Sequence, residues 1–206
     1  MEVARVTVAG WAVATLVAGA VSTGCGGGNK ASSPSSSAAS SSSAASSAGS
    51  GTAAPPAQPT DYGALLIKAS DIGGDLSAPQ PPVLNPNGAA GVAQLFANPD
   101  NSRRISDTIS IVADPAAAAT RLDNTKTNYA GKVSGAWQPV DVGSNGAMVS
   151  GTSPDNSQAI TVLLFTEGKA LVDLEFAGAS NDPIDADVAK DIGRKQDSAI
   201  KKGLPD

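Results

Sequence analysis

The sequence contains no histidine and only one cysteine, Cys25, among its 206 residues. Without histidine, neither a Ser-His-Asp triad nor a Cys-His pair can form. Zinc, copper and haem sites depend mainly on histidine and cysteine ligands, so none is expected downstream of Cys25. A single cysteine also excludes an intramolecular disulfide, so the fold must be held by its core. We therefore expect no catalytic residues, no metal and no cofactor, and we expect that the protein is not an enzyme.

Basic residues and aromatic residues are also scarce. Residues 60–206 carry twelve Lys and Arg against eighteen Asp and Glu, a net charge of −6. An acidic surface does not favour nucleic acid or anionic lipid headgroups, so no nucleic-acid partner is expected. Phe, Trp and Tyr together make up only 3% of the chain.

The N-terminal 24 residues have the pattern of a signal peptide. Residues 6–21 are almost wholly apolar or small. This run suits the hydrophobic region of a signal peptide and is short for a membrane span, which needs roughly 20 apolar residues. The basic region before it is weak, because Arg5 is its only basic side chain and Glu2 opposes it. A start codon assigned at the wrong position would explain that weakness.

Cys25 follows this run directly and is predicted to carry the lipid of a membrane lipoprotein. Gly24-Cys25 resembles the end of the bacterial lipobox, and Thr23 is tolerable there, whereas Ser22 stands where a larger aliphatic residue is usual. A thioether-linked diacylglycerol and an amide-linked acyl chain such as palmitate would anchor the chain stably. The alternative is an ordinary free cysteine after an uncleaved anchor. Lipidation predicts attachment to the cell membrane, facing the extracytoplasmic side.

Residues 25–59 then form a linker, and residues 60–206 form one domain. Positions 31–50 comprise twelve Ser, six Ala, one Pro and one Gly, a composition that cannot build a core. As a flexible chain this linker would span roughly 30–35 Å. It is either a bare spacer or a stalk with O-linked sugars. The length of the remainder suits a single domain.

The domain is predicted to be α+β, with an antiparallel sheet of five to six strands and helices packed on one face. A short apolar element opens it at 65–72 and ends at Gly73-Gly74. Apolar alternation and turn signals predict strands at 91–97, 104–112, 137–142, 145–152, 158–165 and 170–176. Pro139 makes the third an edge or bulged strand. The last two form a hairpin that turns at Glu167-Gly168.

Two Asp-Pro pairs predict helix starts. Asp114-Pro115 supplies an N-cap and a first-turn proline, and Ala118, Leu122 and Tyr129 share one face of the helix that follows. Asp182-Pro183 repeats this signal before the last helix. Its apolar stripe consists of Ile184, Val188, Ile192, Ala199 and Ile200. Acidic side chains lie in its first half and basic ones in its second, as the helix dipole favours. Gly193 inside this helix suggests close packing on the sheet.

Few side chains suggest a functional site. Asp107 shares a strand face with Ile105 and Ile109, so it is either a functional carboxylate in a cavity or is turned outward by a bulge. Asp173 and Glu175 share the predicted solvent-exposed face of their strand. They could pair as acid and base, hold Ca²⁺, or only keep the surface soluble. The segment 142–146 is interpreted as a turn. Trp137 either lines a groove or closes the core.

The order of motifs resembles a known family. The pattern comprises Leu65-Leu66-Ile67, Ile109-Ser-Ile-Val, Asp114-Pro115, Trp137-Gln-Pro-Val, Val142-Gly, Val149-Ser-Gly-Thr, Ile160-Thr-Val-Leu, Leu171-Val-Asp-Leu and the terminal helix. It resembles actinobacterial, especially mycobacterial, envelope lipoproteins, whose domain looks like the extracellular sensor domain of PknH-type serine/threonine kinases. More distantly it is similar to PsbP-like domains. The kinase sensor domains carry disulfides, which this domain cannot form.

The resemblance implies a binding or sensing role outside the cytoplasm. We expect a tethered module for a small apolar or envelope-derived molecule. A ligand site is predicted between the helices and the apolar sheet face, at Ile109, Ile111, Leu122, Trp137, Val172 and Leu174. The same residues would close the core if the protein were instead a structural or interaction lipoprotein without a small ligand. A hydrolase built on serine and carboxylates is the third alternative.

Overall fold

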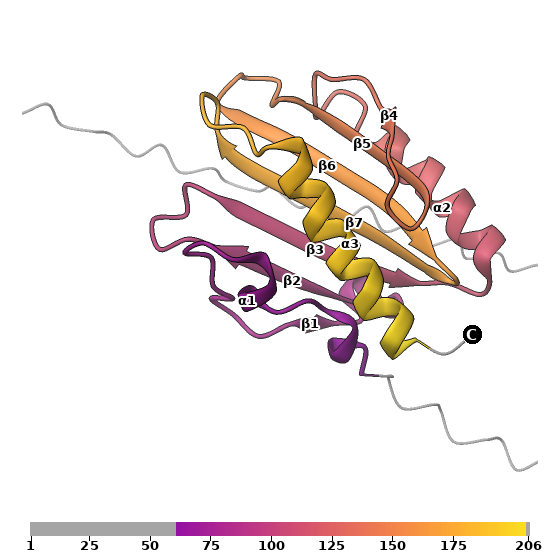
Figure 1. The fold of residues 1–206 in the computed structure, drawn as a ribbon. Helices are drawn as coiled ribbons and strands as arrows, with labels where there is room; N and C mark the ends of the chain where they lie inside the picture. The colour runs from indigo at the N-terminus through magenta and orange to yellow at the C-terminus, as the bar shows by residue number, and fades with distance from the viewer. Residues whose placement is uncertain (1–60, 205–206) are drawn as a thin grey trace, which may run out of the picture. The chain divides into compact units, whose positions relative to one another are not determined.

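The computed structural model describes residues 61–204, drawn in colour in Figure 1. Every element described below belongs to one compact unit, Thr52–Asp206. The predicted signal peptide, Cys25 and the linker lie outside the described residues. No helix within 61–204 is both long enough and apolar enough to cross a membrane.

One antiparallel sheet of seven strands forms the centre of the domain. In space the strands follow the order β1-β2-β3-β7-β6-β5-β4. Their bounds are Val83–Leu84 (β1), Gly91–Ala97 (β2), Arg104–Ile111 (β3), Gln138–Pro139 (β4), Ser144–Thr152 (β5), Gln158–Glu167 (β6) and Ala170–Ala179 (β7). The two edge strands have only two residues each. The helices are α1 (Ala69–Ile72), α2 (Pro115–Asn128) and α3 (Ala186–Gly203), with 3₁₀ turns η1 (Gly63–Leu65) and η2 (Pro86–Gly88).

The predicted α+β class with an antiparallel sheet is confirmed, while two details differ. The strand count is higher because the two-residue strand β1 forms inside a segment that reads as a proline-rich loop. The helices lie on both faces of the sheet: α3 crosses the near face in Figure 1 and α2 lies behind it. Both faces need cover because β6 is buried on both, with six consecutive buried residues from Thr161 to Thr166.

The larger core lies between the sheet and α3. Ile192 and Ile200 of α3 pack with Ile109, Leu163 and Leu174, which point to this face from three neighbouring strands. In this core β3 pairs with β7 in a register that places Ile109 opposite Val172. The N-terminal residues Leu65 and Ile67 complete the cluster.

A smaller core lies on the opposite face, under α2. Leu122 packs there with Val149, Val162 and Leu164. Asp114 accepts a hydrogen bond from the backbone N–H of Ala117 at 2.8 Å, which confirms it as the N-cap and stabilises the helix by about 1 kcal/mol. Both cores consist of residues within 62–204. The unit Thr52–Asp206 therefore contains both hydrophobic cores.

The start of the last helix differs from the prediction. The N-cap is Asp185, whose carboxylate accepts hydrogen bonds from the backbone N–H groups of Asp187 and Val188. Asp182 and Pro183 precede the helix in the loop after β7. Asp182 is then available to bind Arg103.

The segment before α1 is held to α3 by one buried amide. Gln196, which is fully buried, accepts a hydrogen bond from the Ile67 N–H at 3.0 Å and donates one to the Leu65 carbonyl at 2.7 Å. Its side chain therefore binds the backbone on both sides of Leu66, where the chain leaves η1 in an extended conformation. This contact fixes the position of α1, which forms a wall of the site described next.

Candidate ligand-binding site

A hollow of about 380 Å³ lies between α1, the first half of α3 and the end of the sheet. We call it the α1–α3 hollow. Its volume is within the range of small-molecule sites, near the lower limit. Its apolar lining includes Ile72, Leu76, Ile105, Phe176, Ile184 and Ile192. Charged side chains stand around this lining, namely Asp75, Arg103, Arg104, Asp182 and Asp185. An apolar floor with a charged rim suits an amphipathic molecule.

The floor is rigid because its side chains belong to the main core. Ile105 and Phe176 lie opposite each other on β3 and β7, and both are buried. Ile192 of α3 is buried beside them in the same cluster. The floor is therefore formed without any ligand.

One wall of the hollow is a glycine pair. Gly73 and Gly74 have φ angles of 85° and 70°, a left-handed conformation that residues with a side chain rarely adopt. A Cβ atom added at either glycine would meet no other atom within 4 Å. The pair thus lets the chain reverse direction after α1 and leaves open space on the side of the hollow.

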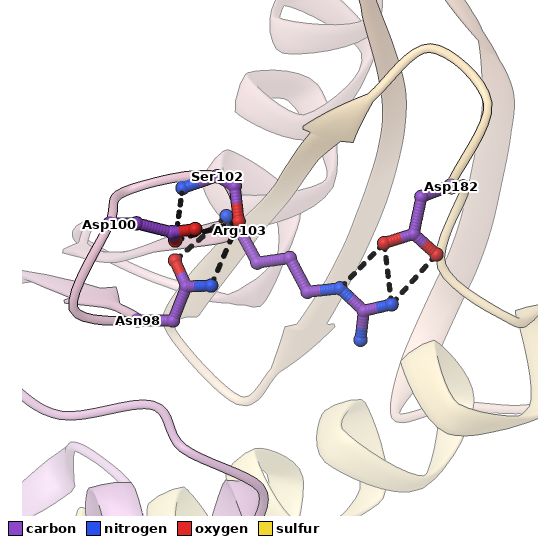
Figure 2. A network of polar contacts seen from close by, with 5 residues as sticks. All are labelled: Asn98, Asp100, Ser102, Arg103 and Asp182. Carbon is purple, nitrogen blue, oxygen red and sulfur yellow. Dashed lines mark hydrogen bonds and ion pairs between the residues drawn. The ribbon is translucent and has the colours of Figure 1, made fainter.

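An ion pair joins two loops at the rim, as Figure 2 shows. The Arg103 guanidinium donates from Nε to Asp182 Oδ2 at 2.8 Å and from Nη2 to Oδ1 at 2.7 Å. Two parallel hydrogen bonds of this kind fix direction as well as distance. Because the pair is solvent-accessible, we expect it to contribute little to stability. Its role is to position the loop before α3 against the turn between β2 and β3.

That turn is tightly organised by its own side chains (Figure 2). Asn98 accepts a hydrogen bond from the Arg103 N–H at 2.9 Å, and Asp100 accepts from the backbone N–H and the hydroxyl of Ser102. These hydrogen bonds hold the pKa of Asp100 below its usual value. Arg103 consequently leaves the turn in a defined direction, toward Asp182.

Val188 lies at the mouth of the hollow and is 48% exposed, although it belongs to the apolar stripe of α3. Its neighbour one turn later, Ile192, is buried. The stripe is therefore covered by the sheet in its second half and left open at its start. An uncovered valine beside an apolar cavity is an accessible contact for a ligand.

The six residues predicted to bind a ligand do not line one cavity. Ile109, Val172 and Leu174 are fully buried in the core under α3, where Ile111 is partly buried at the margin. The other two lie on the opposite face. Leu122 and Trp137 border a separate hollow of about 400 Å³ beside α2.

Trp137 packs edge-on against Tyr129, with ring centroids 6.3 Å apart. Its fluorescence therefore reports on the face under α2 and not on the α1–α3 hollow.

Asp107 is fully buried on the apolar face, as strand alternation predicts; the outward-facing alternative is wrong. Neither carboxyl oxygen has a hydrogen-bond partner within 61–204. The neighbouring amide of Gln94 donates instead to the carbonyls of Gln80 and Leu95. Burial, and secondly the charge of Asp173, raise the pKa of Asp107 to about 8. Asp107 does not line the hollow, although Ile105, two residues before it, does.

Asp173 and Glu175 share the face under α2, where the Tyr129 hydroxyl joins them. This hydroxyl lies 3.0 Å from Asp173 Oδ1 and 3.1 Å from Glu175 Oε2. Burial raises the pKa of Asp173 to about 7, against the lowering effect of the Tyr129 hydrogen bond. The pKa of Tyr129 is also raised, first by burial, so its hydroxyl stays a donor. The cluster fastens the end of α2 to β7.

Metal binding was the other interpretation of these two carboxylates. Calcium takes six to eight oxygen ligands in proteins. Within residues 61–204 no three Asp or Glu side chains gather in a geometry that could hold a metal ion. The segment 142–146 forms the turn into β5 and its start, as predicted.

The residues of the hollow were not identified from the sequence as a site. Three signals were present: the Gly73-Gly74 pair, the Asp182-Pro183 pair, and Val188 near the start of an apolar stripe. Each has a simpler interpretation alone, as a terminator, a cap and a core residue. Only the fold brings them together.

Comparison with known proteins gives the fold but no family. No protein-family model matches the chain, and no curated protein matches it. Among solved structures, the domain is similar to the extracellular domain of PknH from Mycobacterium tuberculosis, with a TM-score of 0.51 and 13% sequence identity. The match covers 70% of this chain and 98% of that domain. The resemblance to PknH-type sensor domains therefore holds at the level of the fold.

Proposed function

We propose that this chain is a lipid-anchored extracytoplasmic module that binds a small apolar or amphipathic molecule in the α1–α3 hollow, without chemical turnover. The observation that carries the proposal is the preformed apolar floor inside a charged rim. The fold shared with the extracellular domain of PknH supports a location outside the cytoplasm and a sensor-like role. The Gly24-Cys25 junction after an apolar run supports the anchor.

The hollow favours a ligand with one polar end. Its depth is lined by aliphatic side chains and Phe176, which suit an acyl or other hydrocarbon group. Arg103 is already paired with Asp182, whereas Arg104 also stands on the rim and has no ion pair within the described residues. An anionic or polar head would therefore be placed near Arg104.

Val188→Glu tests this proposal, because it places a carboxylate at the mouth of the hollow on an exposed position. We expect the affinity for the apolar probe N-phenyl-1-naphthylamine to fall at least about tenfold, which is about 1.4 kcal/mol. Native mass spectrometry of the protein purified from its own envelope should show a co-purifying molecule that Val188→Glu removes.

The matched control is Val83→Glu, which makes the same change at an exposed valine outside the hollow. It should bind the probe as the unaltered protein does. Equal affinities for the two variants, together with no co-purifying molecule, would contradict the proposal.

A structural or interaction role is the second candidate, and one observation favours it. Val83 and Leu84 on edge strand β1 are 57% and 45% exposed, and Leu95 on the neighbouring strand β2 is also exposed. Apolar side chains at a sheet edge are a surface on which another protein can pack. Failure of the ligand test would leave this role as the better explanation.

A further inference from the structure

A basic groove of about 700 Å³ lies between the second half of α3 and the segment that leads from η1 into α1. Its charged lining consists of Lys68, Asp71, Arg194, Lys195 and Lys202. Residues Leu66, Ile67 and Ala199 provide apolar contacts between these side chains. The groove is separate from the α1–α3 hollow, although α1 contributes to both, through Asp71 to the groove and Ile72 to the hollow.

The two walls of the basic groove are fastened to each other. The buried amide of Gln196 binds the backbone of Leu65 and Ile67. Lys195 adds a second link, because its ammonium donates to the Asp71 carbonyl at 2.8 Å. The groove therefore keeps its shape without a ligand.

The charge of this groove is opposite to that of the domain. Four basic side chains face one carboxylate, on a domain whose net charge is −6. Lys195 forms an ion pair with Asp191 at 2.8 Å. Lys68, Arg194 and Lys202 have no ion pair within residues 61–204. Three positive charges without an ion pair, with Asp71 as the one carboxylate of the lining, are thus gathered at one place.

The spacing of these charges suits a surface. Arg194 and Lys202 are eight residues apart on α3, which separates their backbones by about 12 Å along the axis. Lys68 adds a third point from the opposite wall. The described chain begins at Asp61, three residues before Ala64 at the margin of the groove. The beginning of the described chain therefore lies beside these charges.

We propose that the basic groove docks the domain on an anionic membrane surface, with phosphate-bearing lipid headgroups as its occupant. Basic side chains held near such a surface each contribute about 1 kcal/mol to binding. The apolar residues between them suit the boundary between headgroups and acyl chains. The inference goes beyond ligand binding in the α1–α3 hollow and does not depend on it.

A membrane fits this groove better than a long polyanion does. Asp187 and Asp191 lie on the same helix, and the rest of the domain is acidic. A nucleic acid that extended beyond the groove would meet these negative charges, whereas a lipid surface can touch the groove alone. The net charge of the sequence does not reveal that the basic side chains of the groove are separated from the acidic remainder of the domain.

Vesicle binding tests the proposal. The unit Thr52–Asp206 contains both complete cores and no lipid anchor, so it is mixed with vesicles of equal parts phosphatidylglycerol and phosphatidylcholine. At low salt it should sediment with them, but not with pure phosphatidylcholine, and high salt should release it. Arg194→Gln with Lys202→Gln should weaken binding about thirtyfold, which corresponds to about 1 kcal/mol for each removed charge.

Arg121→Gln with Lys126→Gln is the matched control, since it removes two charges from α2 outside the groove. This variant should bind as the unaltered unit does. Equal loss in both variants, or no preference for phosphatidylglycerol, would overturn the proposal. Inorganic phosphate provides a further arm: if it raises the Tm of the unaltered unit but vesicles do not bind, the groove takes a soluble anion and the membrane proposal is wrong. Neither double variant changes the lining of the α1–α3 hollow, so the two proposals fail independently.

Discussion

Two buried polar side chains, Gln196 and Asp107, have opposite environments. Gln196 satisfies both ends of its amide on the backbone of Leu65 and Ile67. Asp107 has no partner for either oxygen within the described residues. An unsatisfied buried polar group costs about 1–3 kcal/mol. Gln196 therefore stabilises the fold, whereas Asp107 lowers its stability and makes it depend on pH.

Asp107→Asn should reduce the pH dependence of stability. The pKa of Asp107 is about 8 in the folded protein and far lower in an unfolded chain, so between these values the folded state holds a proton that the unfolded chain releases. Stability must then fall as pH rises from about 4 to about 8, and level off above. The raised pKa of Asp173 acts in the same direction. Asparagine cannot titrate, so the Tm of the variant should fall less between about pH 5 and about pH 8.5.

The control for this measurement is Asp141→Asn, at an exposed position. It should keep the pH dependence of the unaltered protein. A slope of Tm against pH that is the same in Asp107→Asn and in the unaltered protein would contradict the assignment to Asp107.

Strand alternation predicted the face on which Asp107 lies but not its environment. The alternation of Ile105, Asp107 and Ile109 places all three side chains on one face. Within the described part of the chain, the Asp107 carboxyl group has no partner because the side-chain amide of Gln94 donates to the carbonyls of Gln80 and Leu95 instead. Gln80 lies in a proline-rich loop. A local pattern carries no information about such a distant contact.

At the scale of elements, α3 is the helix on which both sites depend. Its first half borders the α1–α3 hollow, its second half carries the basic groove, and its centre crosses the sheet. Gly193 lies at that crossing and is buried. A Cβ atom at this position would overlap Cδ2 of Leu163 and come within 3.0 Å of Cγ1 of Val142.

Gly193→Ala should destabilise the domain, although alanine is the better helix former by about 1 kcal/mol. Leu163 is completely buried and cannot move aside without disturbing the core, and overpacking of this kind costs about 1–3 kcal/mol. We expect Tm to fall. The control is Ala186→Gly, at the exposed start of the same helix. It measures the effect of exchanging alanine and glycine on helix stability at a position without a close contact. A gain in Tm for Gly193→Ala would contradict this expectation, because it would show that α3 can move away from Leu163 without loss of stability.

The sequence predicted α3 well in its second half and poorly at its start. Periodicity identified Ile192 and Ile200, which are buried, and the glycine that allows close approach. It also included Ile184, which precedes the helix, and Val188, which is exposed. An apolar stripe shows which residues of a helix can be buried. Which of them are buried depends on how far the sheet extends beneath the helix.

At the scale of the whole molecule, the predicted ligand residues lie on both faces of the sheet and not on one. Alternation of apolar and polar side chains tells which residues share a face of the sheet. A strand buried on both faces, such as β6, lacks this alternation, so its sequence does not tell the two faces apart. The prediction therefore combined Leu122 and Trp137 with residues from the opposite side. The fold class survived this error because it depends on the order of elements.

Cys25→Ala should move the protein from the membrane fraction to a secreted or uncleaved form. The reason is that acyl chains on this cysteine supply most of the predicted attachment. Mass spectrometry of the unaltered protein should show a mature chain that begins at Cys25 and carries acyl groups. Ser22→Leu, which brings the junction closer to the usual lipobox, should stay lipidated. A mature protein that retained residues 1–24, or lacked an acyl mass, would contradict the anchor.

The contact of Gln196 with the segment before α1 has a mechanical consequence. Within residues 61–204, the first long-range hydrogen bonds along the chain are those of Leu65 and Ile67 with Gln196. A pulling force on the chain ahead of Asp61 is therefore borne by α3 before it reaches the sheet. If that force exceeds what these two bonds, the core packing of Leu65 and Ile67 and the Lys195 contact with the Asp71 carbonyl can bear together, the segment separates from α3 and takes α1 with it. Since α1 borders both the hollow and the groove, tension in the tether would open the two sites together.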